Sequence, residues 1–132
     1  MGKEADWNTA GKAIVHNMWG DTVVTGMEAQ SGRAGFGAAM GEEAMAIFSE
    51  VFARPGLSQR ERSLVTLSVL VAMRGGMGDQ VRRHIEGAFA NGLTPEELEE
   101  VCLQIARYNG YPNASMAFQQ VQEVAKERGL LR

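Results

Sequence analysis

The sequence has little cysteine and little histidine: one cysteine and two histidines occur in 132 residues. A single cysteine excludes an intrachain disulfide, and the apolar neighbours of Cys102 predict a reduced thiol in the core. With only His16 and His84, a histidine-rich metal site is excluded, and the carboxylates show no ligand spacing. The sequence also lacks an HExxH motif, a Walker loop and a serine elbow. No metal site is therefore expected.

Excess positive charge and long hydrophobic runs are absent as well. The net charge is −3 and no basic run occurs, so a nucleic-acid partner is not expected. The longest uncharged apolar stretch, Ser63 to Met73, reaches only about half of the ~20 residues that cross a bilayer. The N-terminus is polar and acidic, unlike a signal peptide. These features predict a cytoplasmic protein without a membrane partner.

A chain of 132 residues is long enough for one domain with a single core. We expect this domain to cover residues 1–132, with a poorly defined N-terminal segment over 1–35 and a helical core over 36–129. The glycine-rich residues 31–41 do not follow a strand, so we interpret them as a linker rather than a nucleotide-binding loop.

No alternating strand pattern of convincing length occurs, whereas apolar residues recur at helical spacing. Ser58 and Glu61 fit a capping box ahead of the apolar run, and Thr94 with Glu97 fits a second one, with Pro95 in its first turn. Further apolar stripes lie in residues 40–52, 78–92 and 113–128, and one or two short helices are expected before residue 30. The pattern predicts an all-α, compact bundle of five to six helices.

The run from Leu64 to Met73 is apolar on nearly every side. Such a pattern is typical of a helix that is buried centrally or between subunits. The eight methionines of the chain are interpreted as gap-filling residues of the core. His16 is expected at the surface.

His84 is the most interesting single residue, because it shares a helical stripe with Val81 and Ile85. An imidazole with a pKa near neutrality suits proton transfer, and the alternative is a core histidine without a chemical role. Glu50 flanks the stripe of residues 40–52 and is either a site carboxylate or an ordinary surface glutamate.

Two arginines, Arg60 and Arg62, lie at the start of the helix that carries the apolar run. They are either surface residues of a capped helix or a clamp for a carboxylate. Gln104 and Asn109 border the inner face of the helix that begins after Thr94, so they are either a polar lining or loop-side residues.

Three segments carry a resemblance to a known family: "SEVFARPGLSQRERSLVTLSVLVA", "RRHIEGAFANGLTPEELEEVCLQIARYNGYP" and "NASMAF". In order and spacing they make residues 40–125 similar to the carboxymuconolactone decarboxylases, relatives of the AhpD-type alkylhydroperoxidases. The resemblance implies an AhpD-like helical fold that assembles as a trimer or hexamer. It also implies cofactor-free loss of carbon dioxide from 4-carboxymuconolactone or a related carboxylated unsaturated lactone, in the degradation of aromatic compounds.

The resemblance also implies site residues. His84 matches the histidine of the family and would be a proton donor or oxyanion partner, and Glu50 matches a glutamate that would orient groups or act as an acid. Arg62 is a candidate for binding a substrate carboxylate. Met77 and Gln80 stand where the peroxidase branch has its two cysteines, so thiol peroxidase chemistry has no nucleophile.

Two other functions stay open at this point. The chain could be an enzyme of the same fold with another reaction, such as isomerisation or cyclisation of a small acid or lactone. It could also be a non-enzymatic oligomeric helper in which His84 is structural.

Overall fold

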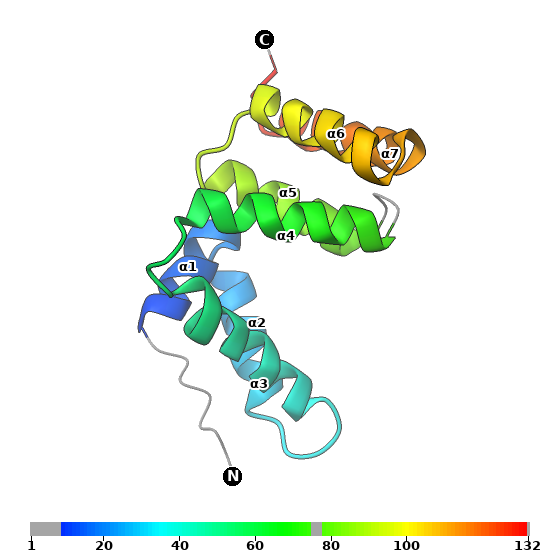
Figure 1. The fold of residues 1–132 in the computed structure, drawn as a ribbon. Helices are drawn as coiled ribbons and strands as arrows, with labels where there is room; N and C mark the ends of the chain where they lie inside the picture. Colours follow the sequence, from blue (N-terminus) through cyan, green and yellow to red (C-terminus); the bar gives the residue numbers. More distant parts are fainter. Residues whose placement is uncertain (1–8, 75–77, 132) are drawn as a thin grey trace. The chain divides into compact units, whose positions relative to one another are not determined.

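The computed structural model describes residues 9–74 and 78–131, and all regular structure in these residues is helical (Figure 1). The elements are α1 (Thr9–Trp19), α2 (Asp21–Ser31), α3 (Ala38–Ala46), the π-helical segment η1 (Ile47–Phe52), α4 (Gln59–Arg74), α5 (Asp79–Ala90), α6 (Pro95–Asn109) and α7 (Tyr111–Glu127). The all-α prediction is confirmed. The described residues form seven α-helices and one π-helical segment, which is more than the expected five to six helices.

The chain divides into two compact units, residues 1–58 and 59–132, and each has its own apolar core. The N-terminal unit runs from blue to teal in Figure 1 and holds α1, α2, α3 and η1. The C-terminal unit runs from green to red and holds α4 to α7. That the two units form one domain stays a prediction.

Glycine shapes the N-terminal unit at two places. The turn between α2 and α3 covers only residues 32–37, so the predicted linker over 31–41 is too long at both ends. Helices α2 and α3 pack against each other, and a Cβ on Gly41 would lie 2.7 Å from the backbone nitrogen of Ser31. Likewise a Cβ on Gly11 of α1 would lie 2.5 Å from Ser49 Oγ of η1. Glycine at these two positions therefore permits close helix packing.

The π-helical segment changes which side chains of residues 40–52 are buried. Phe48 and Phe52 are buried as predicted, and the Phe48 ring meets Trp19 edge-on at a centroid distance of 5.5 Å. Met40, Ile47 and Val51 are exposed, although they share the predicted stripe. A π-helix has hydrogen bonds from i to i+5 and a wider turn than an α-helix, so the spacing of three and four residues does not hold across this segment.

The C-terminal unit contains two neighbouring helix pairs, α4 with α5 and α6 with α7, and α7 also packs on α5. The predicted inner faces of the last three helices are confirmed. Their buried members are Val81, Ile85, Ala88 and Phe89 of α5, Leu98, Cys102 and Ile105 of α6, and Ala117, Val121, Val124 and Ala125 of α7.

The start of α6 is stabilised by the predicted capping box. The Glu97 backbone N–H donates to Thr94 Oγ1 at 3.1 Å, and the Thr94 N–H donates to Glu97 Oε2 at 3.0 Å. Arg60, near the start of α4, donates to Glu97 Oε1 at 2.7 Å and to the carbonyl oxygen of Gly92. Arg60 thus joins the beginnings of α4 and α6, which is a structural role.

Helix α4 is predicted to be buried centrally or between subunits, and within this chain only part of its apolar surface is buried. Leu67 and Val71 are buried, whereas Val65, Val69 and Met73 are 54%, 50% and 73% exposed. These three residues, called the α4 stripe below, lie at i, i+4 and i+8 on the side of the helix that faces away from the core. Met73 is therefore not a gap-filling residue within this chain. No helix of the described residues is long and apolar enough to span a membrane.

Candidate functional site

His84 lies on α5 beside the buried stripe of that helix. Its side chain is partly exposed, while the Nδ1 atom is buried. Burial lowers the pKa of His84 to about 4, and the positive charge of Arg83 contributes to the lowering. The imidazole is therefore uncharged at neutral pH and can both donate and accept a hydrogen bond.

Arg83 is a cationic neighbour that the sequence reasoning did not single out as a site residue. It is exposed and adjacent to His84 in the chain, and this adjacency was the signal that could have revealed it. Arg82 has a different task, because its guanidinium pairs with Glu123 at 3.8 Å and with Glu127 of α7. Arg82 therefore stabilises the packing of α5 on α7, and Arg83 acts on His84.

Arg62 belongs to the same helix pair as His84. It lies in the first turn of α4, it is half-buried, and its Nε atom is buried. Asn91 Nδ2 donates to Ser63 Oγ at 2.9 Å, which places the end of α5 beside the beginning of α4. His84 lies seven residues before Asn91, so it is about 10 Å further along the pair. The structure therefore brings Arg62 and His84 onto one helix pair, about two helical turns apart along the axis.

Glu50 lies in η1 of the N-terminal unit, and its side chain is exposed. It thus belongs to a different compact unit from His84 and Arg62. A role for this carboxylate beside His84 stays a prediction.

A hollow of about 370 Å³ lies between α4 and α6. Its lining consists of Leu64, Ser68, Ala72, Val101, Gln104, Ile105, Tyr108 and Asn109. Gln104 and Asn109 thus both line this hollow, and a functional role for them stays a prediction. His84 and Arg62 do not belong to this lining.

Three further expectations concern the thiol of Cys102, a metal site and the second histidine, His16. Cys102 is a free, buried thiol whose pKa is raised to about 11 by burial and by the charge of Glu99. Among the described residues, no three His, Cys, Asp or Glu side chains gather where they could hold a metal ion. His16 is exposed as predicted and pairs with Asp21 at 2.6 Å. Gln80 lies in the first turn of α5, and Met77 lies outside the described residues.

Fold and site together define an all-helical protein with an uncharged, partly buried imidazole beside an arginine, an arrangement that can bind a small acid. The sequence places it more narrowly. The model of the Carboxymuconolactone decarboxylase family matches residues 35–123, which is more than half of the chain, and the chain belongs to this family.

Two relatives are named as decarboxylases. The chain is 41% identical over 83 residues to the 4-carboxymuconolactone decarboxylase of Acinetobacter baylyi, covering 63% of this chain and 60% of the relative. It is 36% identical over 63 residues to nitrosuccinic acid decarboxylase npaB of Metarhizium robertsii, covering 48% of this chain and 43% of the relative. The chain thus spans 60% or less of the length of either relative.

Proposed function

We propose that the protein is a cofactor-free carboxy-lyase that acts on 4-carboxymuconolactone or a related carboxylated unsaturated lactone in the degradation of aromatic compounds. The observation that carries the proposal is the partly buried imidazole of His84, with its pKa lowered to about 4, inside the segment that matches the family. Similarity to the 4-carboxymuconolactone decarboxylase of Acinetobacter baylyi supports the substrate class.

The chemistry of such a substrate makes a cofactor unnecessary. When the carboxylate leaves as carbon dioxide, the two electrons of the broken carbon–carbon bond move through the double bond into the lactone carbonyl. The protein then has to bind the carboxylate, stabilise the oxyanion and deliver one proton to carbon.

In the proposed reaction, these three roles belong to His84, Arg62 and Glu50. An uncharged His84 donates a hydrogen bond to the developing oxyanion, and it becomes a proton donor when a bound anion raises its pKa. Arg62 binds a substrate carboxylate with its planar guanidinium. A separation of about 10 Å along the α4–α5 pair is one that the arginine side chain and a small acid can span together. Glu50 orients a group or acts as an acid.

A second substrate class follows from the similarity to nitrosuccinic acid decarboxylase npaB. Nitrosuccinic acid carries a nitro group, which can hold the electrons of the broken bond as a lactone carbonyl does. The property shared by both acids is an electron acceptor within the molecule, and this property defines the class of substrates to be tested.

The first experiment mixes the purified protein with 4-carboxymuconolactone and follows the ultraviolet absorbance and the release of carbon dioxide. His84→Ala is expected to lower kcat by about 10²–10⁴-fold, the usual contribution of a general acid–base group. His16→Ala is the matched control and should keep the full rate, since His16 is exposed and pairs with Asp21.

Circular dichroism of each variant separates loss of activity from loss of fold. Arg62→Lys should raise KM more than it lowers kcat, with Arg107→Lys on the exposed side of α6 as its control.

Glu50→Gln is compared with Glu43→Gln, which changes an exposed carboxylate of α3. Full activity in both His84→Ala and Glu50→Gln would refute the site assignment, and an unchanged spectrum at high protein concentration would reject the lactone.

We also propose that the protein works as a homo-oligomer, a trimer or hexamer, in the cytoplasm. The exposed α4 stripe supports an assembly, because Val65, Val69 and Met73 form a connected apolar surface. The free thiol of Cys102 is compatible with a reducing compartment.

A further inference from the structure

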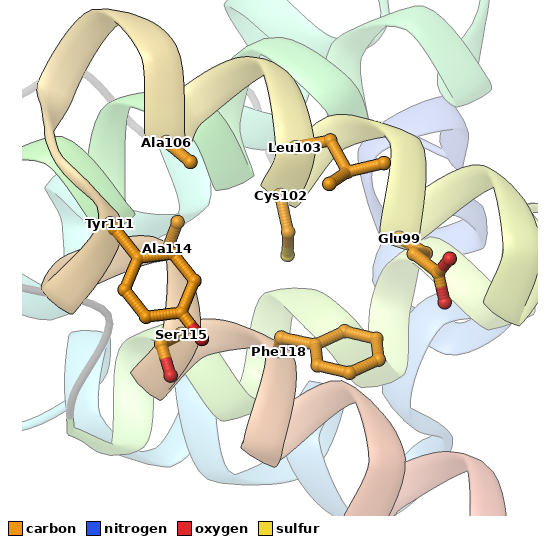
Figure 2. A pocket seen from close by; sticks show the side chains of 8 residues that line it. All are labelled: Glu99, Cys102, Leu103, Ala106, Tyr111, Ala114, Ser115 and Phe118. Carbon is orange, nitrogen blue, oxygen red and sulfur yellow. The ribbon is translucent and has the colours of Figure 1, made fainter.

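A hollow of about 290 Å³ lies between α6 and α7 of the C-terminal unit (Figure 2). Its lining includes neither His84 nor Arg62. Each helix contributes residues at i, i+3, i+4 and i+7 to its lining, which is the face that one helix turns toward another. Both helices contribute small side chains: Ala106 at position i+7 of the α6 set, and Ala114 and Ser115 at positions i+3 and i+4 of the α7 set. Small side chains on both faces leave a space between two helices that otherwise pack closely.

The walls of this hollow suit a flat aromatic ring. Tyr111 and Phe118 of α7 present their rings on one side, and the sulfur of Cys102 points into the space from α6 (Figure 2). Aromatic rings attract one another in offset and edge-to-face arrangements, and sulfur packs favourably on aromatic rings. A cavity of about 150 Å³ lined by apolar residues can hold benzene, so 290 Å³ has room for one substituted ring.

Charge decides which aromatic molecule fits. Glu99 is the one charged residue of the lining, and its carboxylate lies at one end of the hollow in Figure 2. Its negative charge acts on groups inside the hollow, since it contributes to the raised pKa of Cys102. The hydroxyls of Ser115 and Tyr111 offer hydrogen bonds toward the other end (Figure 2). An anion would be repelled here, whereas a hydrogen-bond donor on the ring can reach an acceptor.

We propose that the hollow between α6 and α7 binds a small aromatic molecule that carries a hydroxyl group and no negative charge. The site is separate from the one proposed for decarboxylation, since a carboxylate substrate is of the wrong charge for Glu99. It therefore serves a ligand other than the carboxylated substrate.

The experiment uses two probes of similar size at pH 7 on the full chain: phenol, which is uncharged, and benzoate, which carries one negative charge. Binding is measured by saturation-transfer NMR and by titration calorimetry. Phenol is expected to bind about tenfold more tightly than benzoate, because a carboxylate at the edge of an apolar site repels an anion. Glu99→Gln, at an exposed position, should reduce this preference by strengthening the binding of benzoate.

Position is tested by filling the hollow. Ala106→Phe should abolish phenol binding, and Ala29→Phe, at an exposed site of α2, is the matched control that should retain it. Glu99→Gln keeps the test valid should Ala106→Phe fail to fold. The proposal is overturned if neither probe binds, if benzoate binds wild type as tightly as phenol, or if a folded Ala106→Phe binds phenol normally.

Discussion

At the scale of the residue, His84 shows how position on a helix controls chemistry. Its neighbours Val81 and Ile85 are fully buried, and the imidazole at the edge of their stripe is buried enough to lose its charge. An ordinary histidine would be about half protonated near pH 6.5, whereas His84 stays neutral down to about pH 4. A neutral imidazole is ready to donate a hydrogen bond at neutral pH.

This pKa makes stability depend on pH. The pKa of His84 is about 4 in the folded chain and 6.5 in the unfolded chain, so between these values the unfolded chain binds more protons and stability falls as pH falls. From pH 7.5 to pH 5, His84 should cost about 2 kcal/mol of unfolding free energy. Urea unfolding at both pH values measures it, and His84→Gln, which does not titrate, should lose less. Equal losses in wild type and variant would contradict the lowered pKa.

At the scale of the element, the junction of α4 and α6 depends on a few polar contacts. The hydrogen bond from Arg60, followed by that from the Thr94 backbone, keeps the pKa of Glu97 below its ordinary value. Glu97 therefore stays charged and serves two partners, the N-cap of α6 and the guanidinium of α4. The capping box is a local sequence signal, but the contact with Arg60, 37 residues away, is not.

Thr94→Ala removes the side-chain acceptor of the capping box and should lower the unfolding free energy by about 1 kcal/mol. Thr94→Ser is the matched control, because serine keeps the hydroxyl and caps as well as threonine. Urea unfolding monitored by circular dichroism gives both values. A Thr94→Ala variant as stable as Thr94→Ser would show that the cap contributes nothing.

At the scale of the whole molecule, the α4 stripe gives the clearest expectation. Three exposed apolar side chains one turn apart form a surface that an assembly can bury. Val65 and Val69 are β-branched and stiff, so ordering them in an interface costs little side-chain entropy.

Val69→Glu should therefore shift the protein from the proposed trimer or hexamer to smaller species, because burying an unpaired charge in an apolar interface is costly. Light scattering after size-exclusion chromatography measures the mass of each variant. Gln122→Glu, on the exposed side of α7, adds the same charge elsewhere and should leave the oligomer intact. A monomeric wild type, or a Val69→Glu variant of unchanged mass, would refute this role of the stripe.

The local features of this protein could be predicted from its sequence. The faces of α5, α6 and α7, the capping box of Thr94 and the surface position of His16 follow from helical spacing and short-range hydrogen bonding. The exposed side of α4 and the shifted face of η1 could not be predicted. An apolar run does not tell which of its sides the chain itself covers, and a π-helical turn arises from packing rather than from a residue pattern.

For the candidate site too, some features follow from the sequence and others only from the tertiary structure. The sequence by itself determined the chemistry that is available: two histidines, one thiol, and two arginines ahead of an apolar run. Only the tertiary structure decided that Arg60 is occupied by Glu97, that His84 is uncharged at neutral pH, and that a hollow lies between α6 and α7. The reason is that burial and charge–charge distances depend on residues far apart in the chain, which come together only when the helices pack.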